Sequence, residues 1–456
     1  MITTLPEIVG TVRTLLKEGE ECYLVGGAVR DLLLQHTAHD FDFCTSGDPR
    51  RLARRVAERT GGAFYVMDEE RLTSRVLVDT LQFPQLVLDF AALQGTLEED
   101  LKGRDFTVNA MALDLRHPEE MIDPLKGARD LQEKWLRPCR QDSFSADPVR
   151  VIRALRYAAG LHLRIEPVTC HLLTTAGPLL EDVSLERKRD ELFKLLDLEV
   201  SFVAVSLMQE LHILNRLGLS LQPQRLAQYR TCELFAALLC SSAGKVRRDF
   251  FTAATFSSAM TQLRPELVRY LSERNSGGRT RLQLSKYFLL MPATKAAMHL
   301  PGELTGIFAR QELDFLHNCL ENEDSATAFV TSEPELTRRE IYRFFNRVGD
   351  EGVGLILLAL ACFAGRPAAE IAQADWLRVL HRSTELLHMW FHHPEVCRPK
   401  PLLNGEKIMA ACKLEPGPLV GQLLEALKEE QAAGEITSTE NALAWLTQRC
   451  HQARES

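Results

Sequence analysis

Short apolar runs separated by polar turns occupy the first hundred residues, and longer amphipathic stretches follow. Four of the short runs predict β-strands, at residues 22–25, 63–67, 75–78 and 86–90. Helical spacing of apolar residues predicts helices at 28–35 and 49–60. Between about residues 200 and 395 there is almost no strand signal, and the apolar run 352–365 is too short to span a bilayer. The pattern therefore predicts an α+β protein with its strands near the N-terminus and a helical remainder.

The sequence 23–43 combines three local signals. An apolar strand ends at Gly26 and Gly27, where the backbone can turn sharply and approach a ligand, and a helix follows. Asp40 and Asp42 are two residues apart in the next strand, so both carboxylates project from one face. Because like charges repel unless a cation lies between them, this pair beside a phosphate-binding turn suits Mg²⁺. Taken singly, the glycines also fit a tight turn, and the two aspartates fit a solvated strand edge.

Length, composition and charge narrow the class of protein. A chain of 456 residues with 45% hydrophobic and 25% charged residues is typical of a globular protein; its length predicts about two to four domains. The net charge of −8 excludes a protein that coats nucleic acid through bulk electrostatics, so any RNA contact must use local patches. The candidate patches are Arg50, Arg51, Arg54 and Arg55; Arg150, Arg153 and Arg156; Arg187, Lys188 and Arg189; and Lys245, Arg247 and Arg248.

The cysteines and the N-terminal segment indicate the cellular compartment in which the protein is expected. The eleven cysteines include no Cys-x-x-Cys pair, and no histidines have ligand spacing, so neither a zinc site nor a disulfide framework is expected. The N-terminal segment carries Glu7 and lacks a long apolar core, which argues against a signal peptide. We therefore expect a protein of the reducing cytoplasm that does not enter a membrane.

Several motifs together resemble one known family. The stretches are GGAVRD (26–31), DFD (40–42), RDFTVNAMA (104–112), DPLKGARDL (123–131), SADPVRVIRALRYAA (145–159), SLERKRDEL (184–192) and the segment 401–446. In type and order they resemble the class II tRNA nucleotidyltransferase and bacterial poly(A) polymerase family. The similarity covers about residues 20–195 and 400–447.

This resemblance implies a reaction and a metal requirement. The 3′-hydroxyl of an RNA would attack the α-phosphate of a nucleoside triphosphate and release pyrophosphate. Asp40, Asp42 and Asp89 would hold two Mg²⁺ ions. Asp89 is included because an unpaired carboxylate in an apolar strand is costly, although it also fits a strand-end residue that reaches solvent.

The resemblance also assigns the incoming nucleotide, CTP or ATP, to two of the motifs. The residues are Gly26, Gly27 and Arg30 for the triphosphate, and Arg104, Asp105 and Asn109 for the ribose and phosphates. Gly103 departs from the family pattern, which usually has arginine there, so one phosphate or RNA contact is expected to be missing or supplied elsewhere.

Base choice would rest on Asp147 and Arg150, three residues apart and therefore expected on one helix face. A carboxylate accepts from the amine of cytosine or adenine, and a guanidinium donates to the neighbouring acceptor, whereas uracil and guanine present a carbonyl instead of the amine. Asp147 before a proline also fits an N-cap, and Ala146 replaces the glutamate often found there. The further candidates are Arg153 and Arg156 for the nucleotide and Arg187 and Arg189 for RNA.

The expected architecture has four parts. A nucleotidyltransferase head with a small mixed sheet and flanking helices (1–140) precedes a helical neck (141–200), body (201–395) and tail (396–456). The tRNA 3′ end would be the partner, and CCA addition or repair is the leading function. The alternatives are a poly(A) polymerase, an enzyme that adds only CC or only A, and an inactive RNA-binding protein. A short polar loop predicted at 68–74 keeps the partial activities open, because a loop between the first two motifs governs the family's switch from C to A.

Overall fold

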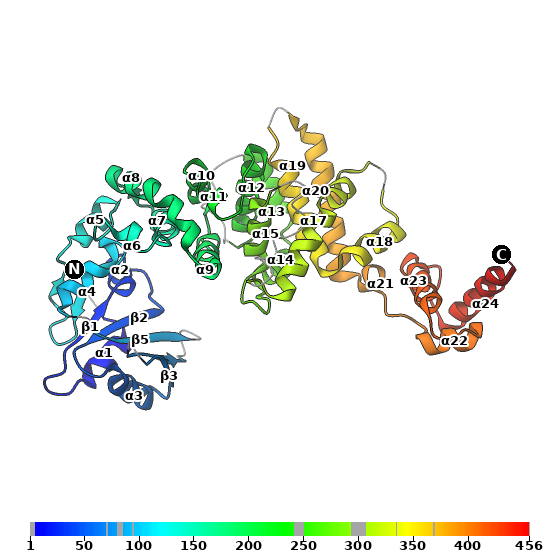
Figure 1. Ribbon diagram of the computed structural model, residues 1–456. Coiled ribbons are helices and arrows are strands. Elements are labelled where there is room, and N and C mark those ends of the chain that lie inside the picture. The colour runs from blue at the N-terminus through cyan, green and yellow to red at the C-terminus, as the bar shows by residue number, and fades with distance from the viewer. Residues whose placement is uncertain are drawn as a thin grey trace. The chain divides into compact units, whose positions relative to one another are not determined.

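A computed structural model describes residues 5–69, 72–79, 85–93, 95–240, 250–292, 307–333, 335–367 and 370–455 (Figure 1). Their contacts form two compact units, Met1–Leu217 and Gly218–Ser456. Within the described ranges, the strands lie in the first unit and the second unit is helical, so the predicted α+β class is confirmed. The basic cluster Lys245, Arg247 and Arg248 and part of the predicted loop 68–74 lie outside the described residues.

A mixed sheet organises the first unit. Seven strands of the described residues form it in the order β3-β4-β5-β2-β1-β6-β7. They are β1 Cys22–Val25, β2 Asp40–Thr45, β3 Ala63–Asp68, β4 Thr73–Val78, β5 Leu86–Ala92, β6 Ala112–Asp114 and β7 Met121–Ile122. β2 and β5 are parallel, and the other neighbours are antiparallel. The four predicted strands are present; three of them extend slightly beyond their predicted ends.

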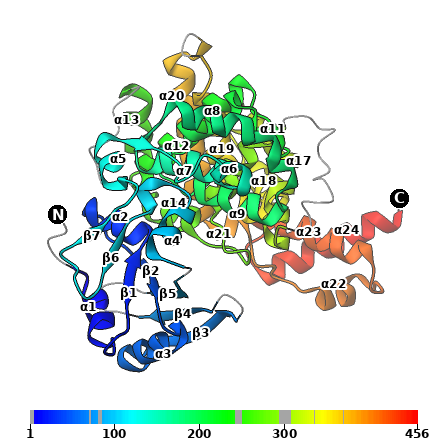
Figure 2. The same ribbon diagram turned by 60° about the vertical axis from the view of Figure 1, so that its left-hand side comes forward.

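Helix α3 (Pro49–Thr60) covers one face of this sheet (Figures 1 and 2). Its start is fixed by Asp48, whose side chain accepts the backbone N–H of Arg50, and by proline at the first helical position. It ends at Gly61, which has a left-handed φ of 70°. The predicted helix 49–60 is confirmed with the same bounds.

Alternation along β2 separates the core under α3 from the opposite face, which is open at Asp40 and Asp42 but buried at Cys44. Phe41 and Phe43 are buried, and the ring of Phe43 stacks on Phe90 of β5 with 5.0 Å between centroids. Asp40 and Asp42 alternate with them and are exposed. The face covered by α3 is therefore the hydrophobic core, and the other face carries the carboxylates.

Helices complete the first unit. They are α1 Glu7–Thr14, α2 Gly27–Leu33, α4 Leu97–Gly103, α5 Gly127–Glu133, α6 Ser143–Ala146, α7 Arg150–Gly160, α8 Pro167–Ala176, α9 Leu185–Leu196, α10 Phe202–Glu210 and α11 Ile213–Arg216, with 3-10 turns η1 Thr107–Asn109 and η2 Gly177–Asp182. A parallel pair, β8 Trp135–Leu136 and β9 Arg164–Ile165, lies among them. α7 and α9 pack against each other on the side of the sheet away from α3 (Figures 1 and 2).

The described part of the second unit consists of helices. They are α12 Pro223–Cys240, α13 Phe250–Ala259, α14 Arg264–Ser272, α15 Arg281–Leu290, α17 Arg310–Thr331, α18 Arg338–Val348, α19 Gly352–Ala364, α20 Gln373–His392, α21 Pro394–Cys397, α22 Gly405–Cys412, α23 Pro418–Ala433 and α24 Thr439–Glu455, with the 3-10 turn η4 Gly349–Glu351. Almost every side chain of α19 is buried, as its apolar sequence predicts. Among the described residues, no helix has the length and apolar character needed to cross a membrane.

One disulfide joins Cys412 at the end of α22 to Cys450 in α24. The expectation that the cysteines form no disulfide is therefore wrong for this pair. The two residues are 38 positions apart in the sequence. Only the packing of α22 on α24 around buried Leu427 and Leu446 brings them together, which no local spacing reveals.

Candidate active site

The open face of the sheet brings together the three carboxylates that the sequence singled out. Asp42 and Asp89 lie opposite each other on the parallel strands β2 and β5, and Asp40 is two residues before Asp42. The pKa of Asp42 is raised, mainly because the carboxylate loses hydration. The charge of Arg104 acts to lower this pKa, and the charges of Asp89 and Asp40 act to raise it. A bound cation would relieve this repulsion.

Asp89 has a partner that the sequence did not indicate. Arg75 lies opposite it on β4, and its Nε and Nη2 donate to the two carboxylate oxygens of Asp89, both at 2.8 Å. Within the described ranges, no group of three or more histidine, cysteine, aspartate or glutamate side chains could hold a metal ion. Asp40 and Asp42 alone still fit Mg²⁺, which takes one or two carboxylates and completes its shell with water and substrate phosphates.

The glycine turn places Arg104 beside Asp42. Gly26 has a φ of 78°, and a Cβ there would lie 2.8 Å from Nη1 of Arg104 and 3.4 Å from Oδ2 of Asp42. The left-handed conformation therefore favours glycine, whereas the guanidinium of Arg104 could move away from a Cβ. The backbone N–H of Gly26 donates to the carbonyl of Met111 at 3.2 Å, so in this structure it is not open to a triphosphate.

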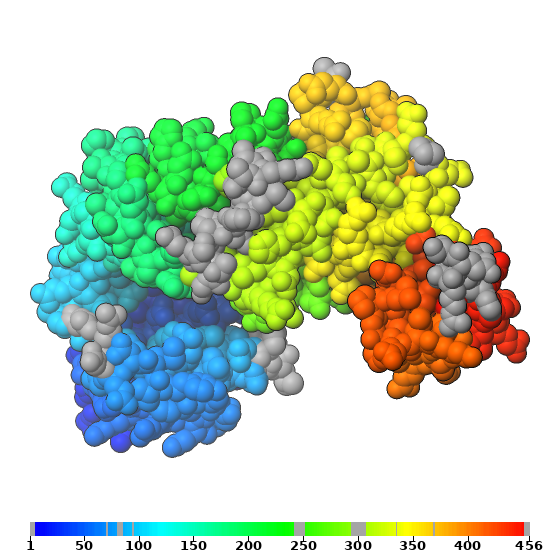
Figure 3. Space-filling view, turned by 45° about the vertical axis from the view of Figure 1, so that its right-hand side comes forward, coloured from blue at the N-terminus to red at the C-terminus, as the bar shows by residue number. Residues whose placement is uncertain are grey.

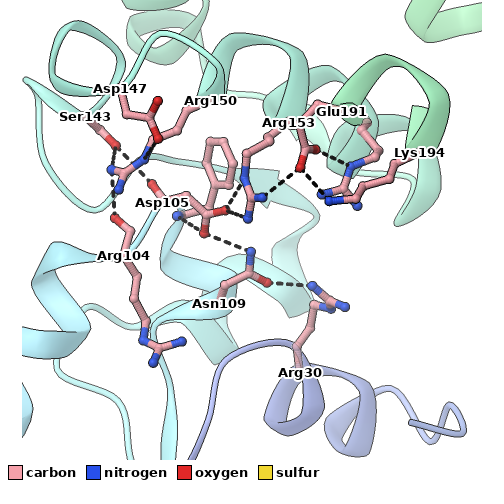
Figure 4. Close-up of polar contacts among 12 residues, drawn as sticks. Arg30, Arg104, Asp105, Asn109, Ser143, Asp147, Arg150, Arg153, Glu191 and Lys194 are labelled. Atoms are coloured by element: carbon pink, nitrogen blue, oxygen red, sulfur yellow. Dashed lines mark hydrogen bonds and ion pairs between the residues drawn. The ribbon is translucent and has the colours of Figure 1, made fainter. Parts of the chain in front are cut away.

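A chain of polar contacts runs from α2 through η1 to α7 (Figure 4). Nη1 of Arg30 donates to Oδ1 of Asn109 at 2.6 Å, and Nδ2 of Asn109 donates to Oδ1 of Asp105 at 3.0 Å. Arg153 donates to the other oxygen of Asp105 from Nε at 3.0 Å and from Nη2 at 2.6 Å. Burial acts to raise the pKa of Asp105, but Arg153 and Asn109 outweigh it and lower the pKa. This carboxylate is held ionised.

The same chain continues to Glu191 on α9 (Figure 4). Its oxygens accept from Nη1 of Arg153 at 3.1 Å, Nε of Arg156 at 3.2 Å and Nζ of Lys194 at 3.0 Å. Burial acts to raise the pKa of Glu191, and Arg156 and Arg153 reverse this effect, so its pKa is lowered. Arg153 and Arg156, predicted to contact the nucleotide, are bound here by carboxylates of the protein.

Asp147 lies between α6 and α7 with extended backbone. α7 begins after Val149 and no side chain caps it, so the alternative prediction of Asp147 as an N-cap is wrong. Both oxygens of Asp147 accept from Nη2 of Arg187, at 2.9 and 3.0 Å, and Oδ2 lies 3.8 Å from Nε of Arg150. Asp147 and Arg150 do not share a helix, but the turn at Pro148 still brings their side chains together.

The guanidinium of Arg150 is fixed from its other side (Figure 4). Nη1 donates to Oγ of Ser143 at 2.6 Å and to the carbonyl of Arg104 at 3.3 Å, and Nη2 donates to the carbonyl of Gly103 at 3.2 Å. A Cβ at Gly103 would meet no atom within 4 Å, so packing does not impose the glycine that replaces the usual arginine.

Most of these residues line one cavity of about 430 Å³ in the first unit. The lining residues are Arg104, Asp105, Asp147, Val149, Arg150, Arg153, Arg187, Asp190, Glu191 and Lys194. Figure 3 shows the first unit hollowed between its blue part and the cyan to green part above it. Arg189, predicted to bind RNA, is not in the lining; it donates to Asp190 at 2.7 Å.

Sequence reasoning missed Asp190, Glu191 and Lys194. Asp190, Glu191 and Lys194 follow Arg187 by three, four and seven positions, so they fall on the same face of α9 as Arg187. That periodicity was readable in the sequence. Arg75 could not be found in this way, because its importance depends on the register between β4 and β5.

Comparison with known proteins gives two family matches, which together cover most of the first unit and end at residue 222. Residues 22–137 match the family described as the poly A polymerase head domain. Residues 162–222 match the family described as the probable RNA and SrmB-binding site of polymerase A.

Three relatives illustrate the range of similar enzymes. The chain is 31% identical to a CC-adding tRNA nucleotidyltransferase of Geobacter sulfurreducens, over 94% of this chain and 92% of the relative. It is also 31% identical to an A-adding tRNA nucleotidyltransferase of Deinococcus radiodurans, over 93% of this chain and 94% of the relative. A CCA-adding enzyme of Streptococcus pyogenes is 36% identical over 41% of this chain and 48% of the relative.

Solved structures share the fold over nearly the whole chain. A CCA-adding enzyme with ATP gives a TM-score of 0.69 at 20% identity, covering 98% of this chain and 96% of the other. The Thermotoga maritima CCA-adding enzyme complexed with tRNA gives a TM-score of 0.63 at 20% identity, with the same coverage. The predicted architecture of a head with a mixed sheet and a helical remainder is thus that of the CCA-adding enzyme structures.

Proposed function

The chain belongs to the class II tRNA nucleotidyltransferase and poly(A) polymerase head family and is a tRNA 3′-end nucleotidyltransferase, and on this premise we propose that it adds C and A from CTP and ATP with release of pyrophosphate. The observation that carries this proposal is the cavity in which Asp147 and Arg150 lie together with Arg104 and Asp105. It combines base-reading groups with groups suited to a ribose and phosphates. We place this activity in the cytoplasm.

Asp40 and Asp42 would hold Mg²⁺ on the open face of the sheet. When bound, the metal lowers the pKa of the attacking hydroxyl and neutralises charge on the phosphates. The chain's own contribution is positioning. Arg104 lies beside Asp42 at the glycine turn and offers a guanidinium to the triphosphate. Asp105 and Asn109, ordered by Arg153 and Arg30, present fixed acceptors and donors to the ribose.

Base selection would come from Asp147 and Arg150. The three contacts that fix Arg150 leave its orientation little freedom, so its donors define one direction for the acceptor of the base. Asp147 accepts from Arg187, and an incoming amine of cytosine or adenine would take over one of those oxygens. Uracil and guanine would bring a carbonyl against this carboxylate, which excludes them.

Addition of only CC or only A is a second candidate. The full-length relatives compared here carry those two names. In addition, only residues 69–72 connect β3 to β4, and only residues 79–85 connect β4 to β5, so the loops between the first and second motifs are short. A short loop favours an enzyme that adds only one kind of nucleotide and does not switch from C to A.

The test offers each of four labelled nucleoside triphosphates with Mg²⁺ to tRNA lacking its 3′ end and to tRNA lacking only the final A. CTP should be used on the first tRNA and ATP on the second, with UTP and GTP at least tenfold poorer; use of only one of the two would indicate a CC-adding or an A-adding enzyme. An unstructured oligoribonucleotide serves as the control substrate. Repeated use of ATP on that control would indicate a poly(A) polymerase, and RNA binding without any incorporation would indicate an inactive binding protein.

A further inference from the structure

Four polar or aromatic side chains form a row across the open face of the sheet. Asp42 of β2 pairs with Asp89 of β5, Asp89 pairs with Arg75 of β4, and Arg75 pairs with Tyr65 of β3. Directly opposed residues on neighbouring strands project from the same face. Because strands lie about 4.8 Å apart, the row runs about 14 Å from the Asp40 and Asp42 pair to the sheet edge.

The chemistry of this row changes from anionic to cationic to aromatic along its length. Arg75 is 37% exposed, and only its Nε and Nη2 bind Asp89, so its remaining donors point away from that pair. Tyr65 is 49% exposed on the edge strand. α3 packs against the other face of the same strands, so it does not cover this row.

We propose that this row is a platform for the last nucleotides of the RNA 3′ strand, an inference that rests on the proposed function. The terminal hydroxyl must lie near Asp40 and Asp42 to react. A strand leading away from that point across the open face reaches Arg75 first and Tyr65 next. Arg75 contacts a backbone phosphate and Tyr65 stacks on a base, which are the contacts by which proteins hold single-stranded RNA.

The same assignment explains the pairing of Asp89. A bidentate carboxylate fixes the plane of the Arg75 guanidinium and leaves donors for a phosphate. In this account Asp89 is a positioning residue that acts through Arg75. RNA is favoured over a protein partner because the row begins at the carboxylates that the terminal hydroxyl must approach.

The test measures binding of the full chain to two RNA hairpins by fluorescence anisotropy. One hairpin carries a single-stranded 3′ overhang of a few nucleotides and the other is blunt. Tyr65→Leu keeps apolar bulk at the strand edge but removes the ring, and should raise the Kd for the overhang hairpin about tenfold. Arg75→Gln should weaken the same binding and reduce its salt slope by about 0.7. Neither variant should change the Kd for the blunt hairpin.

Two controls keep the outcome interpretable. Tyr65→Phe retains the ring and should bind the overhang hairpin like the wild type. Val66→Ala changes the neighbouring residue, which is also exposed, at 41%, and lies opposite buried Ser74, on the other face of the sheet. It should leave both Kd values unchanged, and thermal unfolding of each variant reports whether the strand edge stays intact.

Wild-type affinity of folded Tyr65→Leu and Arg75→Gln for the overhang hairpin would overturn the platform. An equal loss of affinity for both hairpins would also overturn the platform, because the contacts would then not be to the 3′ strand. Failure of the proposed function would give a different result: the wild-type protein would bind the overhang hairpin but would incorporate no nucleotide into tRNA.

Discussion

The surroundings of Asp42 disfavour its ionised form. It faces Asp40 and Asp89, and loss of hydration acts in the same direction on its pKa. We predict that Asp42→Asn lowers nucleotide addition by about a thousandfold or more, because the variant loses an anionic metal ligand. The unliganded variant should be at least as stable as the wild type at neutral pH, because the substitution removes a repelled charge. Incorporation assays and thermal unfolding measure the two effects.

A metal titration of the same proteins separates the two roles of Asp42. Mg²⁺ should raise the unfolding temperature of the wild type and leave that of Asp42→Asn nearly unchanged, since a ligand stabilises only the protein that binds it. Glu58→Gln, an exposed substitution on α3 at the opposite face, should respond to Mg²⁺ like the wild type. An equal response of all three proteins would contradict the assignment of the metal to this pair.

Asp147 provides a second prediction about single residues. Asp147→Asn should reduce the preference for CTP over UTP by about tenfold, because the amide offers a donor to the carbonyl that the carboxylate rejects. Its unfolding temperature should change little, because Asp147 does not cap α7. Rates of incorporation of the competing nucleotides give the ratio.

Arg187→Ala is the matched variant for that measurement. It removes the residue that donates to Asp147 but leaves the carboxylate and Arg150 in place. The preference of Arg187→Ala for CTP over UTP should therefore match that of the wild type. Unchanged selectivity in Asp147→Asn, or its loss in Arg187→Ala alone, would count against base reading by Asp147.

At the scale of elements, Glu191 couples α9 to α7. Glu191→Gln leaves Arg153 and Arg156 without a shared counter-charge, and we expect it to cost about 3 kcal/mol of unfolding free energy at neutral pH. The pKa of Glu191 is lowered from an ordinary value of 4.5, so its contribution is complete above that value and is lost as the pH falls through the lower folded value. The difference in unfolding free energy between Glu191→Gln and the wild type should shrink only when the pH falls below the ordinary pKa of glutamate.

Chemical denaturation at several pH values measures this difference. Glu186→Gln, at an exposed position in the first turn of the same helix, is the matched control and should stay within about 0.5 kcal/mol of wild type. A difference between Glu191→Gln and wild type that grows on acidification would contradict the network, because the sign would then be that of a carboxylate with a raised pKa.

What the sequence could predict followed from local pattern. The strand spacing of Asp40 and Asp42, the glycine turn and helix α3 were all readable, since each depends on neighbours in the chain. The alternative of Asp147 as an N-cap arose because aspartate before proline often starts a helix, whereas here the residue before Pro148 stays extended, as steric contact with the ring favours. The pair of Arg75 and Asp89 could not be read, because it needs the register of two strands.

At the scale of the whole molecule, the helical second unit offered no chemical signal in its sequence. Its apolar periodicity predicted buried helices such as α19 correctly but could not show that α22 and α24 approach closely enough to place Cys412 beside Cys450. The relatives align over almost the entire chain, so the similarity reaches well beyond the motifs of the first unit. We predict that this long helical portion limits addition to folded tRNA, because it provides a surface against which an RNA of fixed size can be measured.

The central claim is that the protein adds a short, defined C and A sequence to tRNA, and product length tests it most directly. Wild-type protein receives Mg²⁺, CTP and ATP with three tRNAs that end at the discriminator base, after one C and after both. A complete enzyme extends all three to the same final A; a CC-adding enzyme stops one nucleotide earlier, and an A-adding enzyme extends only the last. The proposal of C and A addition predicts the first of these end points, and either of the other two would identify the second candidate instead. Products of open-ended length, or equal extension of an unstructured RNA, would contradict the central claim.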